Sequence, residues 1–181
     1  LDRTNLEMIK ISELANAPLK WVQPRLRWHF ELRFGETIFA TLRFQSAFKT
    51  IAWAESGDGS WVFKRFGFWQ NQASIWESGT EKGIAIFKQH TWKRGGILTF
   101  NHGNQYKIRA NFWFTKFDWL DMEENPLATF NMGGFFKQNA DVEVLPRAAT
   151  LAELPILVLF GWYIILMKIR DAAVVTTAAA S

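Results

Sequence analysis

An uninterrupted run without a charged side chain, residues 154–167, constrains this chain more than any other feature. A helix that is apolar on every side must be buried, either in protein or in lipid. Thr150 and Glu153 stand ahead of the run at the spacing of a capping box. Lys168 and Arg170 follow it and suit the negative end of a helix dipole. Both ends of a buried helix are therefore marked in the sequence.

The length of this helix favours a protein core over a membrane. Its uncharged residues would rise about 21 Å at about 1.5 Å each, which is less than the roughly 30 Å of a bilayer hydrocarbon core. Pro155 lies too deep for an ideal first turn, which indicates a later start or a bend at that residue. We predict a buried helix over about residues 150–170, and a bilayer span over 148–169 is the alternative.

Alternation of apolar and polar side chains indicates β-strands ahead of the helix. The chain carries 10 Trp and 17 Phe, a load that suits strands and a thick core. One apolar series recurs at every second position, at Leu26, Trp28, Phe30, Leu32 and Phe34. After a turn at Gly35 and Glu36, a second series follows at Ile38, Ala40, Leu42 and Phe44. Each of these strands would pack one face and expose the other.

More strands are expected along the rest of the chain, near residues 48–54, 61–68, 73–77, 84–89, 97–101, 105–118, 127–132 and 142–145. Polar, glycine-rich turns separate them. About ten to twelve short strands at this spacing imply a sandwich or a barrel. We expect one domain over 25–171, preceded by a segment of uncertain structure at 1–24 and followed by a flexible tail at 172–181.

A closed sheet of this many strands is wider than its own inward side chains can fill, and an apolar helix would fill it. The order of elements over residues 28–170, strands first and one hydrophobic helix last, resembles the tubby-like superfamily, which includes the tubby C-terminal domain, phospholipid scramblases and plant LURP-one-related proteins. Residues 151–160, Leu-Ala-Glu-Leu-Pro-Ile-Leu-Val-Leu-Phe, look like the helix that closes the family's barrel. The resemblance implies a mainly β, single-domain, closed antiparallel β-barrel around a C-terminal hydrophobic central helix.

A second resemblance is local. Residues 107–111, Lys-Ile-Arg-Ala-Asn, followed by residues 115–117, Thr-Lys-Phe, are similar to the tubby segment in which Lys-x-Arg supports phosphoinositide binding. The resemblance implies a lipid- or anion-binding site that comprises Lys107, Arg109, Asn111 and Lys116.

The physical case for this site rests on strand periodicity. Side chains two residues apart share one face, so Lys107, Arg109 and Asn111 would line up on the outer wall. The opposite, packed face would carry Tyr106, Ile108, Ala110, Phe112 and Phe114. Such a row could hold a phosphate through the fork of the arginine and the point charge of the lysine. A solvated strand face without a ligand is the alternative.

Other charged clusters are better explained as solvated surface. The basic ones are Arg25, Arg27 and Arg33, the pair Lys64 and Arg65, and the pair Lys93 and Arg94. The acidic cluster at Asp118, Asp121, Glu123 and Glu124 fits an acidic turn near a strand end. The chain has 21 Lys and Arg against 17 Asp and Glu, a mild basic excess that is compatible with anionic partners.

Catalysis gets little support from the sequence. Without Cys, disulfides, thiolate metal sites and a cysteine nucleophile are excluded. His29, His90 and His102 show no recognised metal-ligand spacing, and no nucleophile elbow, Walker loop or dinucleotide-binding glycine motif occurs. We therefore expect no catalytic residues, no metal, no cofactor and no small-molecule substrate.

These observations favour a non-catalytic binding or scaffold module. It would act at an anionic, phosphoinositide-like membrane surface or as an accessory subunit of a membrane-associated protein complex, and we expect it in the cytoplasm, peripheral to a membrane. One alternative is a tail-anchored subunit of a membrane complex, whose last helix lies in the bilayer. Another is a nucleic-acid-binding barrel, which is disfavoured because the aromatic side chains alternate inward.

Overall fold

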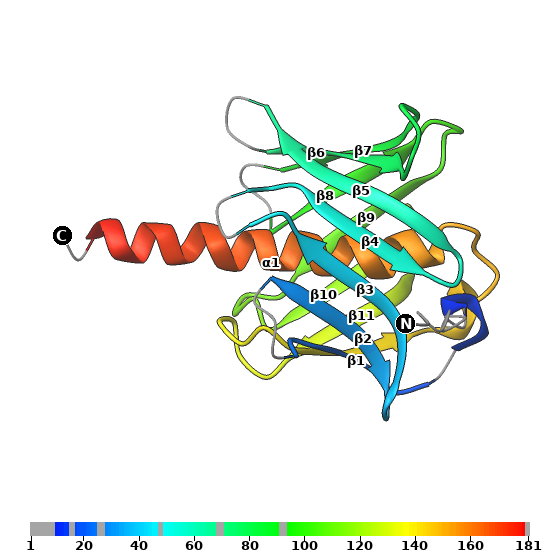
Figure 1. Cartoon of the computed structure of the whole chain (residues 1–181), viewed down its shortest axis with the longest axis horizontal. Coiled ribbons are helices and arrows are strands. Elements are labelled where there is room, and N and C mark those ends of the chain that lie inside the picture. The colour runs from blue at the N-terminus through cyan, green and yellow to red at the C-terminus, as the bar shows by residue number, and fades with distance from the viewer. Residues whose placement is uncertain are drawn as a thin grey trace, which may run out of the picture.

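A computed structural model describes residues 10–14, 17–24, 28–46, 49–67, 71–90 and 94–179, with the side chains of the last helix up to residue 175. Within this part of the chain, strands precede one long helix (Figure 1). The strands are β1 (Leu19–Val22), β2 (His29–Phe34), β3 (Thr37–Phe44), β4 (Ala52–Ser56), β5 (Gly59–Phe66), β6 (Gln72–Glu77), β7 (Gly83–Gln89), β8 (Gly95–Phe100), β9 (Gln105–Ala110), β10 (Lys116–Leu120), β11 (Pro126–Met132) and β12 (Ala140–Val144). The helices are the short 3-10 turns η1 (Ile11–Leu14) and η2 (Pro146–Ala148) and the α-helix α1 (Leu154–Ala179).

The strands form one closed antiparallel barrel. Each strand pairs with its neighbours in the sequence, and β1 closes the circle by pairing with both β2 and β12. Inward positions alternate with outward ones as in any strand, so Ala40, Leu42 and Phe44 of β3 are buried while Arg43 is exposed. The prediction of a mainly β, closed antiparallel barrel with a C-terminal helix is confirmed.

Helix α1 fills the lumen of the barrel. Every residue over 154–167 is buried. Trp162 stacks on Trp21 of β1 with ring centroids 5.8 Å apart, and Phe160 meets the ring of Phe63 edge-on at 5.2 Å. Burying each large apolar side chain stabilises the fold by about 1.5–3 kcal/mol. The predicted burial of this run inside the protein is confirmed.

The ends of α1 differ from the prediction. The helix begins at Leu154, which places Pro155 in the first turn, where a missing N–H loses no helical hydrogen bond. Glu153 forms no capping box, because its carboxylate bonds side chains of the β8–β9 hairpin instead. At the other end α1 leaves the barrel and continues to Ala179 (Figure 1), so helix covers most of the segment 172–181 predicted as a tail.

The single strand predicted over 105–118 is two strands, β9 and β10. Asn111 folds the chain between them, because its side-chain oxygen accepts hydrogen bonds from the backbone N–H groups of Thr115 at 2.9 Å and Lys116 at 3.1 Å. The expectation that Phe112 lies on the packed face was therefore wrong. Its side chain stands at the tip of this turn and is 61% exposed.

The barrel also begins before residue 25, because β1 lies within the segment 1–24 whose structure the sequence left uncertain. Several predicted positions lie outside the described residues: Arg25, Leu26, Arg27, Phe48, Phe68 and Lys93.

The described residues contain no helix whose length and hydropathy would allow it to cross a membrane.

Candidate anion-binding site

The predicted cations Lys107 and Arg109 lie on the outer wall of the barrel. Both belong to β9, whose alternate residues Tyr106 and Ile108 are buried inside. The shared face expected for the two cations follows from this alternation. Their side chains are 29% and 59% exposed, so both remain open to a ligand from solvent.

A hollow of about 660 Å³ lies beside these cations, over β8 and β9. His90 and Arg94 line it from the β7–β8 connection. Gly95 of β8 pairs with Arg109 across the two strands and also lines the hollow. A Cβ atom on Gly95 would lie 1.9 Å from the carbonyl oxygen of Ile108, so the close approach of the strands requires glycine.

One carboxylate, that of Glu124, bridges the two cations. The Nζ atom of Lys107 is 2.5 Å from Glu124 Oε1, and Nη1 of Arg109 is 3.1 Å from Oε2. The hydrogen bond from Lys107, with the positive charges of Lys107 and Arg109, holds the pKa of Glu124 below its ordinary value. The two cations can therefore bind one small anionic group between them.

Glu124 reaches the cations from the β10–β11 turn. Asp121 closes this turn by accepting hydrogen bonds at 2.9 Å from the backbone N–H groups of Glu123 and Asn125. Glu124 adopts a left-handed backbone with φ of 67°. Hydrogen bonds from Asn125 lower the pKa of Asp121. The sequence predicted an acidic turn here, but it did not indicate that Glu124 would pair with the basic row.

Arg94 brings a further positive charge to the hollow. Its guanidinium carbon lies 4.4 Å from the centroid of the Phe112 ring. A planar guanidinium stacks well on an aromatic face, and this contact orients the side chain. The sequence placed Arg94 among solvated surface residues, whereas the structure places it in the lining of the same hollow as Lys107 and Arg109.

The other two predicted site residues lie elsewhere. The carboxamide of Asn111 is used by its own turn, where it also donates to Thr115 Oγ1 at 3.0 Å. Lys116 begins β10, and its Nζ atom lies 3.5 Å from Asp118. Neither Asn111 nor Lys116 is among the residues that line the hollow. The structure brings together two of the four predicted residues and adds Arg94, His90 and Glu124.

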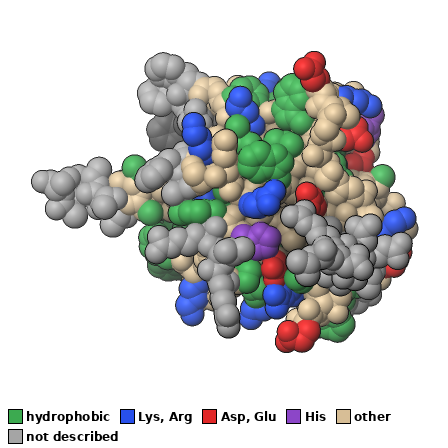
Figure 2. Space-filling model, viewed as in Figure 1, with side chains coloured by type: hydrophobic (Ala, Val, Ile, Leu, Met, Phe, Trp, Pro, Cys, Tyr) green, Lys and Arg blue, Asp and Glu red, His purple; other side chains and the backbone are tan. Residues whose placement is uncertain are grey.

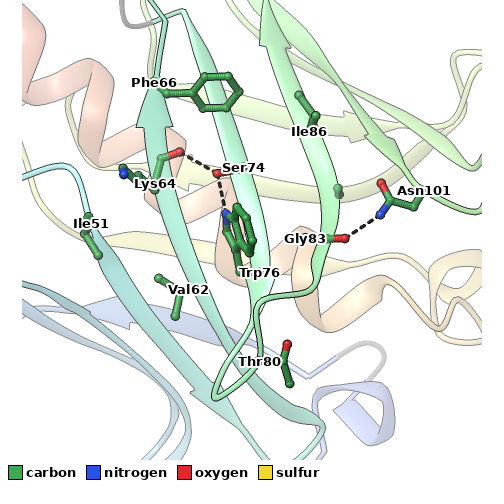
Figure 3. Close-up of a pocket in the computed structure, with 11 residues that line it drawn as sticks. Ile51, Val62, Lys64, Phe66, Ser74, Trp76, Thr80, Gly83, Ile86 and Asn101 are labelled. Carbon is green, nitrogen blue, oxygen red and sulfur yellow. Dashed lines mark hydrogen bonds between the residues drawn. The ribbon is translucent and has the colours of Figure 1, made fainter.

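A second hollow of about 690 Å³ lies on the outer wall over β5, β6 and β7 (Figure 3). Its polar groups are largely satisfied within the wall. The indole N–H of Trp76 donates to Ser74 Oγ at 2.8 Å, and the side-chain amide of Asn101 donates to the carbonyl of Gly83 at 2.6 Å. Of its described lining residues only Lys64 is charged. This hollow therefore suits an anion less well than the first.

A buried carboxylate, Glu153, lies at the end of the barrel opposite the exit of α1. His102 Nε2 lies 2.7 Å from its Oε1, Asn104 donates to the same oxygen at 2.7 Å, and Tyr106 donates to Oε2 at 3.1 Å. Burial raises the pKa of Glu153, but these hydrogen bonds outweigh it and lower the pKa overall. Burial and the neighbouring carboxylate raise the pKa of Tyr106 to about 12. The cluster fastens the start of α1 to the β8–β9 hairpin.

The described residues hold no group of three or more His, Asp or Glu side chains arranged to bind a metal ion. The three histidines lie apart: His29 contacts Glu31, His102 contacts Glu153, and His90 lines the basic hollow.

No family model, curated protein or solved structure matches the chain.

Proposed function

We propose that this chain is a non-catalytic, tubby-like binding module that holds an anionic phospholipid headgroup in the hollow beside β8 and β9. The observation that carries the proposal is the pair Lys107 and Arg109, which close on a single carboxylate at 2.5 Å and 3.1 Å. A phosphate monoester offers the same two-oxygen edge with more negative charge. With Arg94, three cations and one acidic side chain, Glu124, line the hollow, so the lining favours an anion.

The filled lumen supports an external binding site. Barrels that carry ligands inside leave an open interior, whereas here α1 occupies it. A ligand would therefore meet the outer wall, where a headgroup at a membrane surface is accessible. Anionic lipids are abundant in the cytoplasmic leaflet, so we place the protein there as a peripheral component.

Charge reversal tests the site. The double variant Lys107→Glu/Arg109→Glu should lose most of its binding to vesicles that contain phosphatidylinositol phosphates, measured by co-sedimentation against pure phosphatidylcholine vesicles. Vesicles with phosphatidylserine at equal total charge separate phosphate recognition from general attraction to anionic lipid. The matched control Lys10→Glu/Lys82→Glu makes the same change of net charge at exposed positions outside the hollow and should bind as the wild type does.

The variant Glu124→Gln should change vesicle binding in the opposite direction. It removes the carboxylate that competes for Lys107 and Arg109, so binding should strengthen while the melting temperature stays close to that of the wild type, because the side chain is half exposed. Equal binding by the wild type and by Lys107→Glu/Arg109→Glu would refute the site. Absence of wild-type binding to every anionic vesicle would refute the lipid function.

A further inference from the structure

The most exposed aromatic side chains in the described part of the chain stand at one end of the barrel, the end where α1 leaves it. Phe112 and Trp113 lie in the β9–β10 turn and are 61% and 72% exposed, and Phe136 lies in the β11–β12 loop and is 63% exposed. Large apolar side chains at the opposite end are less open, with Phe34 at 45% and Met122 at 44%. The two ends therefore differ in how much apolar surface they present to solvent.

The loops that carry these exposed rings are held by packed aromatic side chains. Phe114 adopts a left-handed backbone with φ of 53° and packs on Phe135, with ring centroids 5.7 Å apart. The Nζ atom of Lys168 lies 6.0 Å from the ring of Phe114, which ties the turn to α1 where the helix leaves the barrel. Phe112 and Trp113, in the same turn as Phe114, meet edge-on at 4.9 Å. The exposed rings are thus held in place beside α1.

Helix α1 continues the same surface outward. Val175 is 69% exposed and lies seven residues after Lys168, so the two share one face of the helix. The sequence over 172–181 carries no charged residue. Phe112, Trp113, Phe136 and Val175 together are called the exit rim.

The charges near the exit rim are predominantly basic. Residues 111–115 and 133–139, which carry the exposed rings, include no acidic residue. Nearby cations are Arg94, Lys116, Lys137 and Lys168. The one acidic residue of α1, Asp171, also lies here and pairs with Arg65 at 2.9 Å. The turns at the opposite end are predominantly acidic, with Glu36, Asp58, Glu81, Asp121 and Glu123 against Lys82, while Glu124 there is paired with Lys107 and Arg109. On the face shown in Figure 2, most Asp and Glu side chains likewise lie in the half away from the projecting helix.

We infer that the exit rim inserts into the interfacial layer of an anionic bilayer. Tryptophan and phenylalanine partition into this layer, and lysine and arginine beside them pair with anionic headgroups. The exposed aromatic side chains project from two separate loops. A lipid surface can cover such projecting side chains because it adapts its shape to them. Negative charge at the opposite end repels the same surface, so the molecule would dock with the exit of α1 toward the membrane.

Arg94 connects the exit rim to the basic hollow, because it lines the hollow while its guanidinium stacks on Phe112. Insertion of Phe112 would therefore bring the hollow to the level of the lipid headgroups. The inference rests on the proposed function, since it places that binding site at a membrane and adds an apolar contact to it.

The double variant Trp113→Ser/Phe136→Ser tests the insertion. Its binding to vesicles of phosphatidylcholine with phosphatidylserine should weaken by about tenfold or more, because apolar burial adds to the electrostatic attraction. The matched control Phe34→Ser/Met122→Ser alters exposed side chains at the opposite end and should bind as the wild type does. Melting curves of both should match that of the wild type, because every altered side chain is substantially exposed.

The fluorescence of an attached label measures the insertion directly. The chain contains no cysteine, so Phe136→Cys gives a single site for an environment-sensitive fluorophore, and Phe34→Cys gives the control. The label at 136 should shift to shorter wavelength and be quenched by spin-labelled lipid, while the label at 34 stays in water.

The outcomes separate the two proposals. If the serine variant binds normally and the label at 136 stays in water, the inference is overturned, even if Lys107→Glu/Arg109→Glu loses binding. If the label at 136 inserts while Lys107→Glu/Arg109→Glu binds as the wild type does, the headgroup site fails and the exit rim stands. Absence of wild-type binding to every anionic vesicle, including those with phosphatidylinositol phosphates, overturns both.

Discussion

Gly95 illustrates how one residue shapes the basic hollow. Its neighbour across the strands is Arg109, and both residues line the hollow. The same position lies against the carbonyl of Ile108, where a Cβ atom would sit at 1.9 Å. A single glycine thus permits the close pairing of β8 with β9 beside Arg109.

We predict that Gly95→Ala lowers the free energy of unfolding by about 1–3 kcal/mol, because the backbone of β8 or β9 must move to admit the methyl group. The matched control is Gly83→Ala in β7, where a Cβ atom would meet only the ring of Trp76 at 4.0 Å. That variant should change the same free energy by no more than about 1 kcal/mol. Urea denaturation of the three proteins measures both values, and equal stability of the two variants would contradict the steric argument.

At the scale of elements, Glu153 joins α1 to the barrel wall. Its carboxylate accepts hydrogen bonds from Asn104 and Tyr106 of the β8–β9 hairpin and contacts His102 there. The residue is 7% exposed, so a loss of these partners would leave a buried polar group unsatisfied. The hairpin and the start of the helix are therefore stabilised together.

The lowered pKa of Glu153 gives this contact a pH dependence. A carboxylate whose folded pKa lies below its unfolded value, here 4.5, contributes stability above that value and loses it as the pH falls through the folded pKa. We expect the melting temperature of the wild type to fall more steeply below about pH 4.5 than that of Glu153→Gln, which should be less stable at neutral pH. The exposed control Glu143→Gln should follow the wild-type curve. A parallel curve for Glu153→Gln would contradict the assignment.

The sequence predicted most elements because their burial is regular. Apolar side chains at every second position, as at Phe30 and Leu32, indicate a strand with one buried face. A run that is apolar on all sides indicates a helix enclosed within the protein. It could not predict β1, because two inward side chains, Leu19 and Trp21, are too few to show a period. It merged β9 with β10 because the turn depends on hydrogen bonds from Asn111, which the apolar pattern does not report.

At the scale of the whole molecule, the basic hollow depends on contacts between hairpins. Strand period alone places Lys107 and Arg109 on one face. Glu124 and Arg94 come from two other connections, and their meeting depends on the register of β8, β9 and β10, such as Leu120 opposite Lys107. A single sequence carries little information on register between strands, so the places of Glu124 and Arg94 in the site became visible only in the structure.

The barrel as a whole depends on its helix. We predict that a chain shortened to end at Ala149 fails to fold, because it leaves an apolar lumen without α1 to fill it. A chain that ends at Asp171 keeps the enclosed part of α1 and should retain the melting transition of the full chain. Solubility and calorimetry compare the two, and a soluble, cooperatively melting protein that ends at Ala149 would show that α1 is not the core.

The position of α1 after every strand sets the order in which a ribosome makes the parts of the core. The twelve strands of the described residues emerge before it, each with an apolar face that has no helix to cover it. Closure must also wait for β12, since it pairs with β1 near the start of the chain. Translation therefore delivers the packing element last, and the nascent strands are natural clients for a chaperone that shields apolar surface until α1 arrives.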